Sequence, residues 1–276
     1  GQVDEVKTDQ NLQTIYASVE PTPQTKNTID DGTLKVSWTA GDAINVFFGT
    51  VSNNKFVTED SGGVAKFKGS VDVITGGGEG LDDDTSLWGV YPYSSENSCD
   101  GNTITLTVPS EQEAAENTFV KGIFPQIARS QNFYMSFYNV CGAFRFSVSS
   151  SDIRSVTLSG NADEQIVGKA SVSMNDYAPK VESLLFGQKV ISMTAPDGGC
   201  FKPGVNYYLV LFPTTFTNGI TLTFYKEDSY ASYVVSKPVS LSRNKVSRLK
   251  DRDAGLTFAP KSMDVWGDGE NIGGNI

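Results

Sequence analysis

The sequence predicts an all-β protein arranged as two tandem β-sandwich domains. Short stretches of alternating apolar residues recur about every 8–12 residues, with glycine, proline, asparagine or aspartate turns between them. No amphipathic stretch has the length of a helix that could cover a core. The 276 residues include 27 glycines and 11% aromatics, which is typical of β-rich proteins with many turns, and they suffice for two sandwiches of about 130 residues each.

We expect four parts along the chain. Residues 1–10 form a polar, flexible leader, 11–130 an N-terminal sandwich, 131–260 a C-terminal sandwich, and 261–276 a tail rich in glycine and aspartate. The boundary is placed at the polar stretch Arg129–Asn132, because the linkers between domains are exposed and polar.

The first half contains strands that alternate between apolar and polar positions, with turn residues between them. The expected strands are Asn11–Glu20, Leu34–Trp38, Ile44–Phe48, Phe56–Val57, Val64–Phe67, Leu87–Tyr93 and Thr103–Val108. Asn53-Asn54 is expected to turn the chain before Phe56. Ser110 and Glu113 resemble a capping box, so one or two helical turns are expected there.

The second half shows the same pattern, with Gly160-Asn161, Asp197–Gly199 and Asn218-Gly219 as turns. Tyr207–Phe212 is continuously apolar and suits an interior strand, whereas Leu256–Phe258 suits an edge strand. The expected strands are Phe133–Val148, Ile153–Leu158, Gln165–Val172, Lys189–Met193, Tyr207–Phe212, Ile220–Tyr225, Tyr230–Val235, Val239–Leu241 and Leu256–Phe258.

Phe133–Val148 is the longest apolar run and is expected to open the second domain. Its apolar positions change parity within the run, from Phe133, Met135 and Phe137 to Phe144, Phe146 and Val148. Because side chains alternate with a period of two along a strand, the change requires a bulge or bend at Asn139–Gly142. A membrane span is excluded, since the run is shorter than the ~20 apolar residues of a spanning helix.

The composition excludes several classes of chemistry. The chain has no histidine, so Ser-His-Asp and Cys-His catalysis and histidine-bearing zinc sites are excluded. A net charge of −10 argues against binding nucleic acid or anionic lipid. Cys141 is expected in the core, while a Cys99–Cys200 disulfide is left open. No catalytic motif is present, so we expect no enzyme, no cofactor and no metal.

Two acidic stretches contain the carboxylates that a calcium ion prefers as ligands. Asp82–Asp84 has no regular alternation of ligands around it, and a solvated loop is the favoured interpretation. The tail residues Asp264, Asp268, Glu270 and Asn271 do not match the D-x-[DN]-x-[DN]-G pattern. Neither stretch therefore predicts a metal site.

Aromatic residues raise the question of sugar binding. Trp38, Trp88, Tyr91 and Tyr93 could line a platform for a sugar ring. Aromatic side chains at alternating strand positions more often belong to the core, which is the interpretation we favour. The exposure of Trp38, Trp88 and Trp266 discriminates between the two.

Five segments in order resemble the fimbrillin family, the pilus and adhesin subunits of Bacteroides-type bacteria. Each segment is short, but together they span about Leu34–Val246. They are Trp38–Val46, which resembles W-x-x-G-D-x-I-x-V; Tyr91-Pro92 after Trp88; Val108–Gln112, which resembles L-P-x-x-Q; Phe137–Phe146; and the set Tyr207–Val210, Gly219–Leu222 and Leu241–Val246.

The resemblance implies sandwiches of the transthyretin-like, Greek-key type and export as a lipoprotein to the outer-membrane surface. Attachment would use a lipid on a residue outside this sequence, and the partners would be other fimbrial subunits and ligands on host or bacterial surfaces. It also implies polymerisation by strand donation, in which a protease removes the first strand and a neighbour's strand fills the groove. The displaced residues would be Ile15, Ala17 and Val19.

One departure from the family concerns this cleavage. The best-known members are cut after an arginine in the first interstrand loop, but the first arginine here is Arg129. The loop Pro21–Gly32 offers only Lys26. Either a different protease acts at Lys26, or the subunit is not matured by cleavage, which would suit a tip, anchor or accessory position.

The leading hypothesis is a non-enzymatic, surface-exposed fimbrial structural or accessory subunit in cell adhesion that assembles by β-strand donation. The alternative is a carbohydrate-binding surface lipoprotein that does not polymerise. The sequence leaves open the ligand, the position in a fimbria and the protease.

Overall fold

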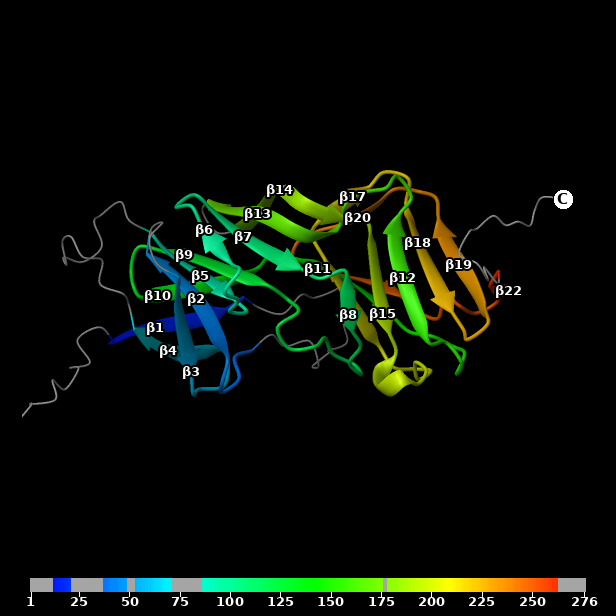
Figure 1. Cartoon of the computed structure of the whole chain (residues 1–276), viewed down its shortest axis with the longest axis horizontal. Coiled ribbons are helices and arrows are strands. Elements are labelled where there is room, and N and C mark those ends of the chain that lie inside the picture. Colours follow the sequence, from blue (N-terminus) through cyan, green and yellow to red (C-terminus); the bar gives the residue numbers. More distant parts are fainter. Residues whose placement is uncertain (1–11, 21–36, 49–52, 71–85, 176–177, 263–276) are drawn as a thin grey trace, which may run out of the picture.

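A computed structural model describes residues 12–20, 37–48, 53–70, 86–175 and 178–262. Strands dominate these ranges (Figure 1), and the helical element among them is the short 3-10 turn Pro196–Gly198. Within the described ranges, no helix is long enough and apolar enough to cross a membrane. The all-β prediction is therefore confirmed.

Seven strands close into a barrel at one end of the molecule (Figure 1). Around the barrel the order is β1 (Leu12–Val19), β10 (Tyr134–Asn139), β9 (Gln126–Ser130), β5 (Leu87–Tyr91), β2 (Ala43–Phe48), β3 (Asn53–Thr58) and β4 (Val64–Ser70), which returns to β1. β1 and β10 run parallel, and every other neighbouring pair is antiparallel. Closure leaves no barrel strand as a sheet edge.

The remaining strands form four sheets, of which the six-stranded one lies at the end opposite the barrel (Figure 1). The six-stranded sheet has the order β22 (Ala259–Pro260), β19 (Ser229–Val235), β18 (Ile220–Tyr225), β12 (Ser155–Gly160), β15 (Val190–Thr194) and β8 (Glu111–Glu113). The others are β14 (Ala178–Gln188), β13 (Val167–Asn175), β7 (Thr103–Val108) and β6 (Ser98–Cys99); β16 (Tyr207–Leu211), β11 (Gly142–Phe146) and β21 (Val246–Leu249); and β17 (Thr214–Phe216) with β20 (Val239–Leu241).

Two hydrophobic clusters fill the described structure. The smaller one lies inside the barrel and includes Ile15, Trp38 and Phe137. The larger one joins the outer side of β5, through Trp88 and Val90, to the strands of the second half. All five residues of β5 are buried because the strand has a core on each side, which explains its unbroken apolar sequence.

The longest apolar run passes from one sheet to another. Its first half is β10 in the barrel, and its second half is β11, which pairs with β16 and β21. The predicted change of parity is confirmed, and the chain crosses between the sheets at the predicted place. Gly142 lies at the crossing, where a Cβ atom would stand 2.5 Å from the Ser242 carbonyl oxygen, so a larger residue would clash.

Strand pairing crosses the expected boundary at residue 130 in both directions. β10 follows residue 130 in sequence and closes the barrel, whereas β7 and β8 precede it and pair with β13 and β15. The expectation that the run from Phe133 opens the second domain does not hold for β10. The division into two domains at 11–130 and 131–260 stays a prediction.

Several element predictions were wrong in detail. Glu111–Glu113 forms strand β8 rather than helical turns, and Asn53-Asn54 lies within β3 rather than in a turn. The expected edge strand Leu256–Phe258 is not formed, and β22 begins one residue after it. The sequence reading missed β14 entirely, because its 11 residues are mostly exposed and lack a regular alternation.

Candidate functional site

The first strand occupies a defined place in the barrel. β1 pairs along one edge with β10 and along the other with β4, so that Ala17 lies opposite both Met135 and Ala65. Without β1 the barrel would be open between β4 and β10, and both of those strands would have unpaired edges. We call this place the β1 slot.

The three residues expected to be displaced all lie on β1. The Ile15 and Ala17 side chains are fully buried in the barrel core. Val19 is half-buried at the end of the strand and packs against the same core cluster. The structure thus places these side chains inside the β1 slot, while their displacement stays a prediction.

Trp38 holds the middle of β1 from inside the barrel. Its indole Nε1 donates a hydrogen bond to the Ala17 carbonyl oxygen at 3.1 Å. The ring makes edge contacts with Phe67, Tyr91 and Phe137 at centroid distances of 4.8, 5.3 and 5.2 Å. Trp38 therefore satisfies its own buried donor and fixes the position of β1 at the same time.

The turn after Trp38 depends on Asp42, whose carboxylate is almost fully buried. Its Oδ2 accepts a hydrogen bond from the Thr39 backbone N–H at 2.8 Å, and its Oδ1 lies 2.5 Å from the Lys121 ammonium. Gly41 supplies the positive φ of +96° that the turn requires. These contacts give the Trp38–Val46 segment a structural role next to the β1 slot.

A buried carboxylate fixes the C-terminal end of β1. Glu20 is 8% exposed, and both of its carboxylate oxygens accept hydrogen bonds from Arg243 Nη1, at 2.8 Å for Oε2. Glu20 Oε1 also accepts the Asn139 backbone N–H at 3.1 Å, and the Glu20 N–H donates to the Phe137 carbonyl at 2.9 Å.

Asn139 and Asn244 extend this arrangement. Arg243 Nη1 donates to the Asn139 carbonyl at 2.8 Å, and Asn139 Nδ2 donates to Asn244 Oδ1 at 2.8 Å. The ends of β1 and β10 are thereby joined to the turn that precedes β21. We call Glu20, Arg243 and Asn139 the carboxylate cluster.

The outer face of the same strands carries an exposed pair of tyrosines. Tyr16 and Tyr134 lie opposite each other in the register, and their rings stack at a centroid distance of 5.0 Å with an angle of 16°. The Lys66 ammonium, on the neighbouring β4, lies 6.0 Å from the Tyr16 ring. These contacts add a second set of interactions that depends on register.

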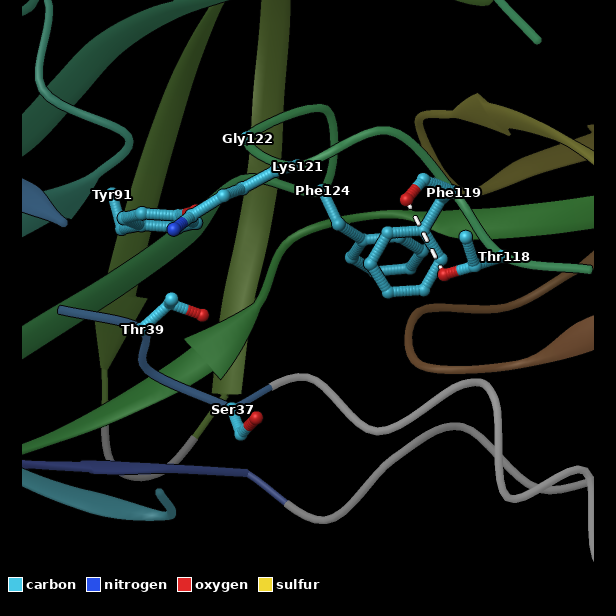
Figure 2. Close-up of a pocket in the computed structure, with 8 residues that line it drawn as sticks. All are labelled: Ser37, Thr39, Tyr91, Thr118, Phe119, Lys121, Gly122 and Phe124. Atoms are coloured by element: carbon cyan, nitrogen blue, oxygen red, sulfur yellow. Dashed lines mark hydrogen bonds between the residues drawn. The ribbon is translucent and has the colours of Figure 1, made fainter. Parts of the chain in front are cut away.

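A pocket of about 210 Å³ lies beside the Trp38 turn (Figure 2). Figure 2 shows the Lys121 side chain running toward Tyr91, with the Phe119 and Phe124 rings on the other side. Burial, together with the negative charge of Asp42, raises the pKa of Tyr91, so its hydroxyl stays protonated at neutral pH. The pocket offers hydrogen-bond donors and aromatic faces, but no pair of carboxylates for acid-base catalysis.

The aromatic residues that could line a sugar platform are mostly in the core. Trp38, Trp88 and Tyr91 are buried, as the favoured interpretation predicted. Tyr93 is half-buried under the Lys55 ammonium, which lies 4.9 Å from its ring. Trp266 lies outside the described residues.

The structure tests the predictions about the cysteines, but it describes neither of the two acidic stretches. All three thiols are free, so the open Cys99–Cys200 disulfide is not formed, and Cys141 is buried in the core as expected. Within the described ranges, no group of three or more acidic or cysteine side chains is placed to hold a metal ion. The acidic stretches, Asp82–Asp84 and the tail residues Asp264, Asp268, Glu270 and Asn271, lie outside those ranges, as does Lys26.

Sequence reasoning missed the carboxylate cluster. Asn139 and Arg243 lie in two of the segments that resemble the fimbrillin family, which is the one signal that marked them. Glu20 is separated from Arg243 by 223 residues, and nothing local to either residue predicts that they meet.

The sequence matches no protein-family model and no curated protein. Solved structures resemble the chain along most of its length. A candidate cell adhesion protein from Bacteroides ovatus is 14% identical with a TM-score of 0.53, and the match covers 90% of this chain and 95% of that one. A second, from Bacteroides uniformis, is 18% identical with a TM-score of 0.50, covering 92% and 97%.

The tip fimbrial protein Mfa3 from Porphyromonas gingivalis, with a C-terminal truncation, is 8% identical with a TM-score of 0.41, covering 90% and 99%. The sequence segments indicated a resemblance to fimbrillin-type proteins, and the solved structures that resemble the chain are described as cell adhesion and fimbrial proteins. Because the sequence identities to the two Bacteroides proteins are low, these matches show only that this chain shares the fold of those candidate cell adhesion proteins.

Proposed function

We propose that the chain is a non-enzymatic, surface-exposed fimbrial subunit, structural or accessory, that acts in cell adhesion and assembles by β-strand donation. The observation that carries the proposal is the β1 slot, in which one strand, β1, completes an otherwise open barrel. A strand from another subunit would enter this slot after β1 leaves it. The shared fold and the family segments support the adhesion role.

Once β1 has left, a β1 slot filled by another strand should be lower in free energy than an empty one. Burying each large apolar side chain contributes about 1.5–3 kcal/mol, whereas each main-chain hydrogen bond contributes only about 0.5–1.5 kcal/mol net. Filling the buried position of Ile15 should therefore contribute more to the binding of a replacement strand than any single main-chain hydrogen bond. An empty slot would also remove the acceptor of the Trp38 indole N–H.

The remaining features follow from the resemblance. We propose an outer-membrane lipoprotein attached through a lipid on a residue outside this sequence, with two domains related to transthyretin-like sandwiches. Its partners would be other fimbrial subunits, and ligands on host or bacterial surfaces would be contacted from the assembled fimbria. Maturation would use cleavage at Lys26, or would not occur in a tip, anchor or accessory subunit.

Limited trypsin digestion tests the maturation and the assembly together. Wild-type protein should be cut at Lys26 while its folded core survives, and the cut protein should form concentration-dependent oligomers on size exclusion and filaments by electron microscopy. The control is Lys26→Gln, which removes this cleavage site and should stay monomeric. Cleavage at Lys26 that leaves a monomer with β1 retained at all concentrations would argue against strand donation.

The alternative carbohydrate-binding role was suggested by the aromatic content and the sandwich architecture, and an exposed tryptophan would favour it. Trp38 and Trp88 are core residues, which counts against it, and Trp266 lies outside the described residues. Tyr16 on β1 and Tyr134 on the neighbouring β10 are exposed, but their rings stack on each other. We therefore retain the fimbrial role alone as the proposal.

A further inference from the structure

A strand that fills the β1 slot has to choose a register. A shift of one residue would turn Tyr16 and Ser18 into the core, which burial forbids. A shift of two residues is less strongly opposed, because the same face still points inward. It would move Ala17 to the position of Ile15 and preserve the pattern of main-chain hydrogen bonds. Apolar contacts alone therefore leave the register incompletely specified.

The carboxylate cluster is specific to one position. The Glu20 carboxylate accepts from Arg243 and from the Asn139 backbone N–H, and both donors are held by other parts of the molecule. Arg243 is itself anchored on the Asn139 carbonyl, so its guanidinium stays in place whichever strand is present. A two-residue shift would withdraw the carboxylate by about 6.6 Å and leave these donors without it.

We propose that Arg243 and Asn139 form a receptor for an acidic side chain at the C-terminal end of whichever strand occupies the β1 slot, and that this receptor sets the strand's register and selects its sequence. The inference rests on the proposed function, since it describes the strand that the slot would exchange. The matching strand has apolar residues at three alternate positions and an acid directly after the third. In β1 these are Ile15, Ala17, Val19 and Glu20.

The chemistry of the receptor explains why an acid is required. A charge-assisted hydrogen bond to a carboxylate is stronger than one to an amide, and an amide would also direct N–H groups at a cation. An apolar residue at this position would leave Arg243, whose side chain is three-quarters buried, without its counter-charge. The receptor thus penalises wrong strands as well as favouring the right one.

Peptide exchange into the cleaved protein tests the selection. A site for a specific protease is inserted after Lys26, the chain is cut, and labelled peptides of residues 11–20 are added under mild denaturant. The C-termini of the peptides are amidated, so that the main chain adds no carboxylate at residue 20. The wild-type peptide should bind at least about tenfold more tightly than the Glu20→Gln peptide. A peptide with Ser18→Glu and Glu20→Ser, whose acid is displaced by two residues, should bind as weakly as the Glu20→Gln peptide.

Protein variants locate the receptor. On Arg243→Met or Arg243→Lys protein the preference for the acidic peptide should shrink, whereas Arg154→Met, which changes an exposed arginine elsewhere, should leave it intact. Equal affinity of wild-type protein for the acidic and neutral peptides would overturn the inference. Because the peptide substitutions leave the folded protein unchanged, the comparison holds even if an Arg243 variant fails to fold.

Hydrogen exchange on the uncut chain separates this inference from the proposed function. The backbone N–H groups of Val19 and of residue 20 donate to the carbonyl oxygens of Gly63 and Phe137. Glu20→Gln should speed hydrogen exchange at these two N–H groups by about tenfold, while exchange in β18 should stay unchanged. Unchanged protection of these amides would refute the role of the cluster. If protection falls as expected but no peptide enters the cut protein, strand exchange fails as a function while the anchoring of β1 by the carboxylate stands.

Discussion

Single buried polar side chains in this protein replace missing backbone partners. Asp253 is 2% exposed, and its carboxylate accepts the Ser149 and Ser150 backbone N–H groups at 2.8 and 2.9 Å and the Ser149 hydroxyl at 2.9 Å. Burial opposes ionisation of Asp253, but these hydrogen bonds outweigh it and lower its pKa. The ionised side chain therefore holds the loop that follows β11.

The lowered pKa of Asp253 predicts a pH dependence of stability. A carboxylate whose folded pKa lies below its unfolded value, about 3.9, stabilises the fold above that value, and this contribution is lost as the pH falls through the folded pKa. Asp253→Asn should be less stable at pH 7 by about 1–3 kcal/mol, because the amide loses acceptor capacity. The difference from wild type should shrink below about pH 4.

Denaturant midpoints measured between pH 2 and 7 check this prediction. Asp152→Asn, which changes an exposed acid beside Lys226, is the matched control and should follow the wild-type curve. A constant difference between Asp253→Asn and wild type across this pH range would contradict the assigned ionisation.

At the scale of the element, one side chain joins two strands from different sheets. Gln112 on β8 accepts the Val210 N–H at 2.9 Å and donates to the Val210 carbonyl at 2.6 Å, while also donating to the Pro109 carbonyl at 3.0 Å. Its amide thus acts as one peptide unit of an added strand along the edge of β16. This explains why Val108–Gln112 forms an extended segment rather than the helical turns its capping-box pattern predicted.

Replacing Gln112 should therefore destabilise the link between β8 and β16. Gln112→Leu keeps most of the volume but leaves the buried N–H and C=O of Val210 unpaired, and a loss of about 2–4 kcal/mol is expected. Chemical denaturation measures it, and Glu111→Leu, at an exposed position of the same strand, is the control. A loss of less than about 0.5 kcal/mol would show that water replaces the amide without cost.

The sequence predicted elements well where burial is one-sided or complete. β1, β7 and β18 have an alternating pattern and β16 a continuous apolar one, and all four lie where these patterns placed them. β14 has exposed Leu185 and Phe186 and pairs with β13 through two irregularities in register, so no regular pattern marks it. Local sequence carries little signal for such a strand.

The candidate site was predictable only in part. The alternation of Ile15, Ala17 and Val19 fixed which face of β1 is buried, because that depends on neighbouring residues alone. The contact of Glu20 with Arg243 depends on how three distant segments pack, as does the contact of Trp38 with Ala17. Neither can be read from spacing in a single sequence.

At the scale of the whole molecule, the two halves of the chain are interleaved. The outer face of the barrel at β5 packs into the larger core together with Leu106 from β7 and Val172 from β13. β10, encoded after residue 130, contributes Met135 and Phe137 to the barrel core. Each half of the sequence thus supplies strands that the other half needs.

This interleaving predicts how fragments behave. A fragment of residues 1–130 lacks β10 and therefore lacks the buried side chains of Met135 and Phe137. Their burial contributes about 3–6 kcal/mol to the free energy of unfolding, which is about 5–15 kcal/mol for a typical domain. It also leaves β1 without its parallel partner. A fragment of residues 131–276 lacks β7 and β8, and with them the Gln112 bridge to Val210.

Neither fragment alone should therefore show a cooperative thermal transition or a native near-ultraviolet circular dichroism spectrum, while the two fragments co-expressed should recover both. The intact chain should unfold in a single transition, because the larger core spans both halves. The control is the full chain cut once at residue 130 after folding, which retains every strand and should keep the native spectrum. A fragment of residues 11–130 that folds alone with a cooperative transition would instead support two separate domains divided at residue 130, despite the strands that cross it.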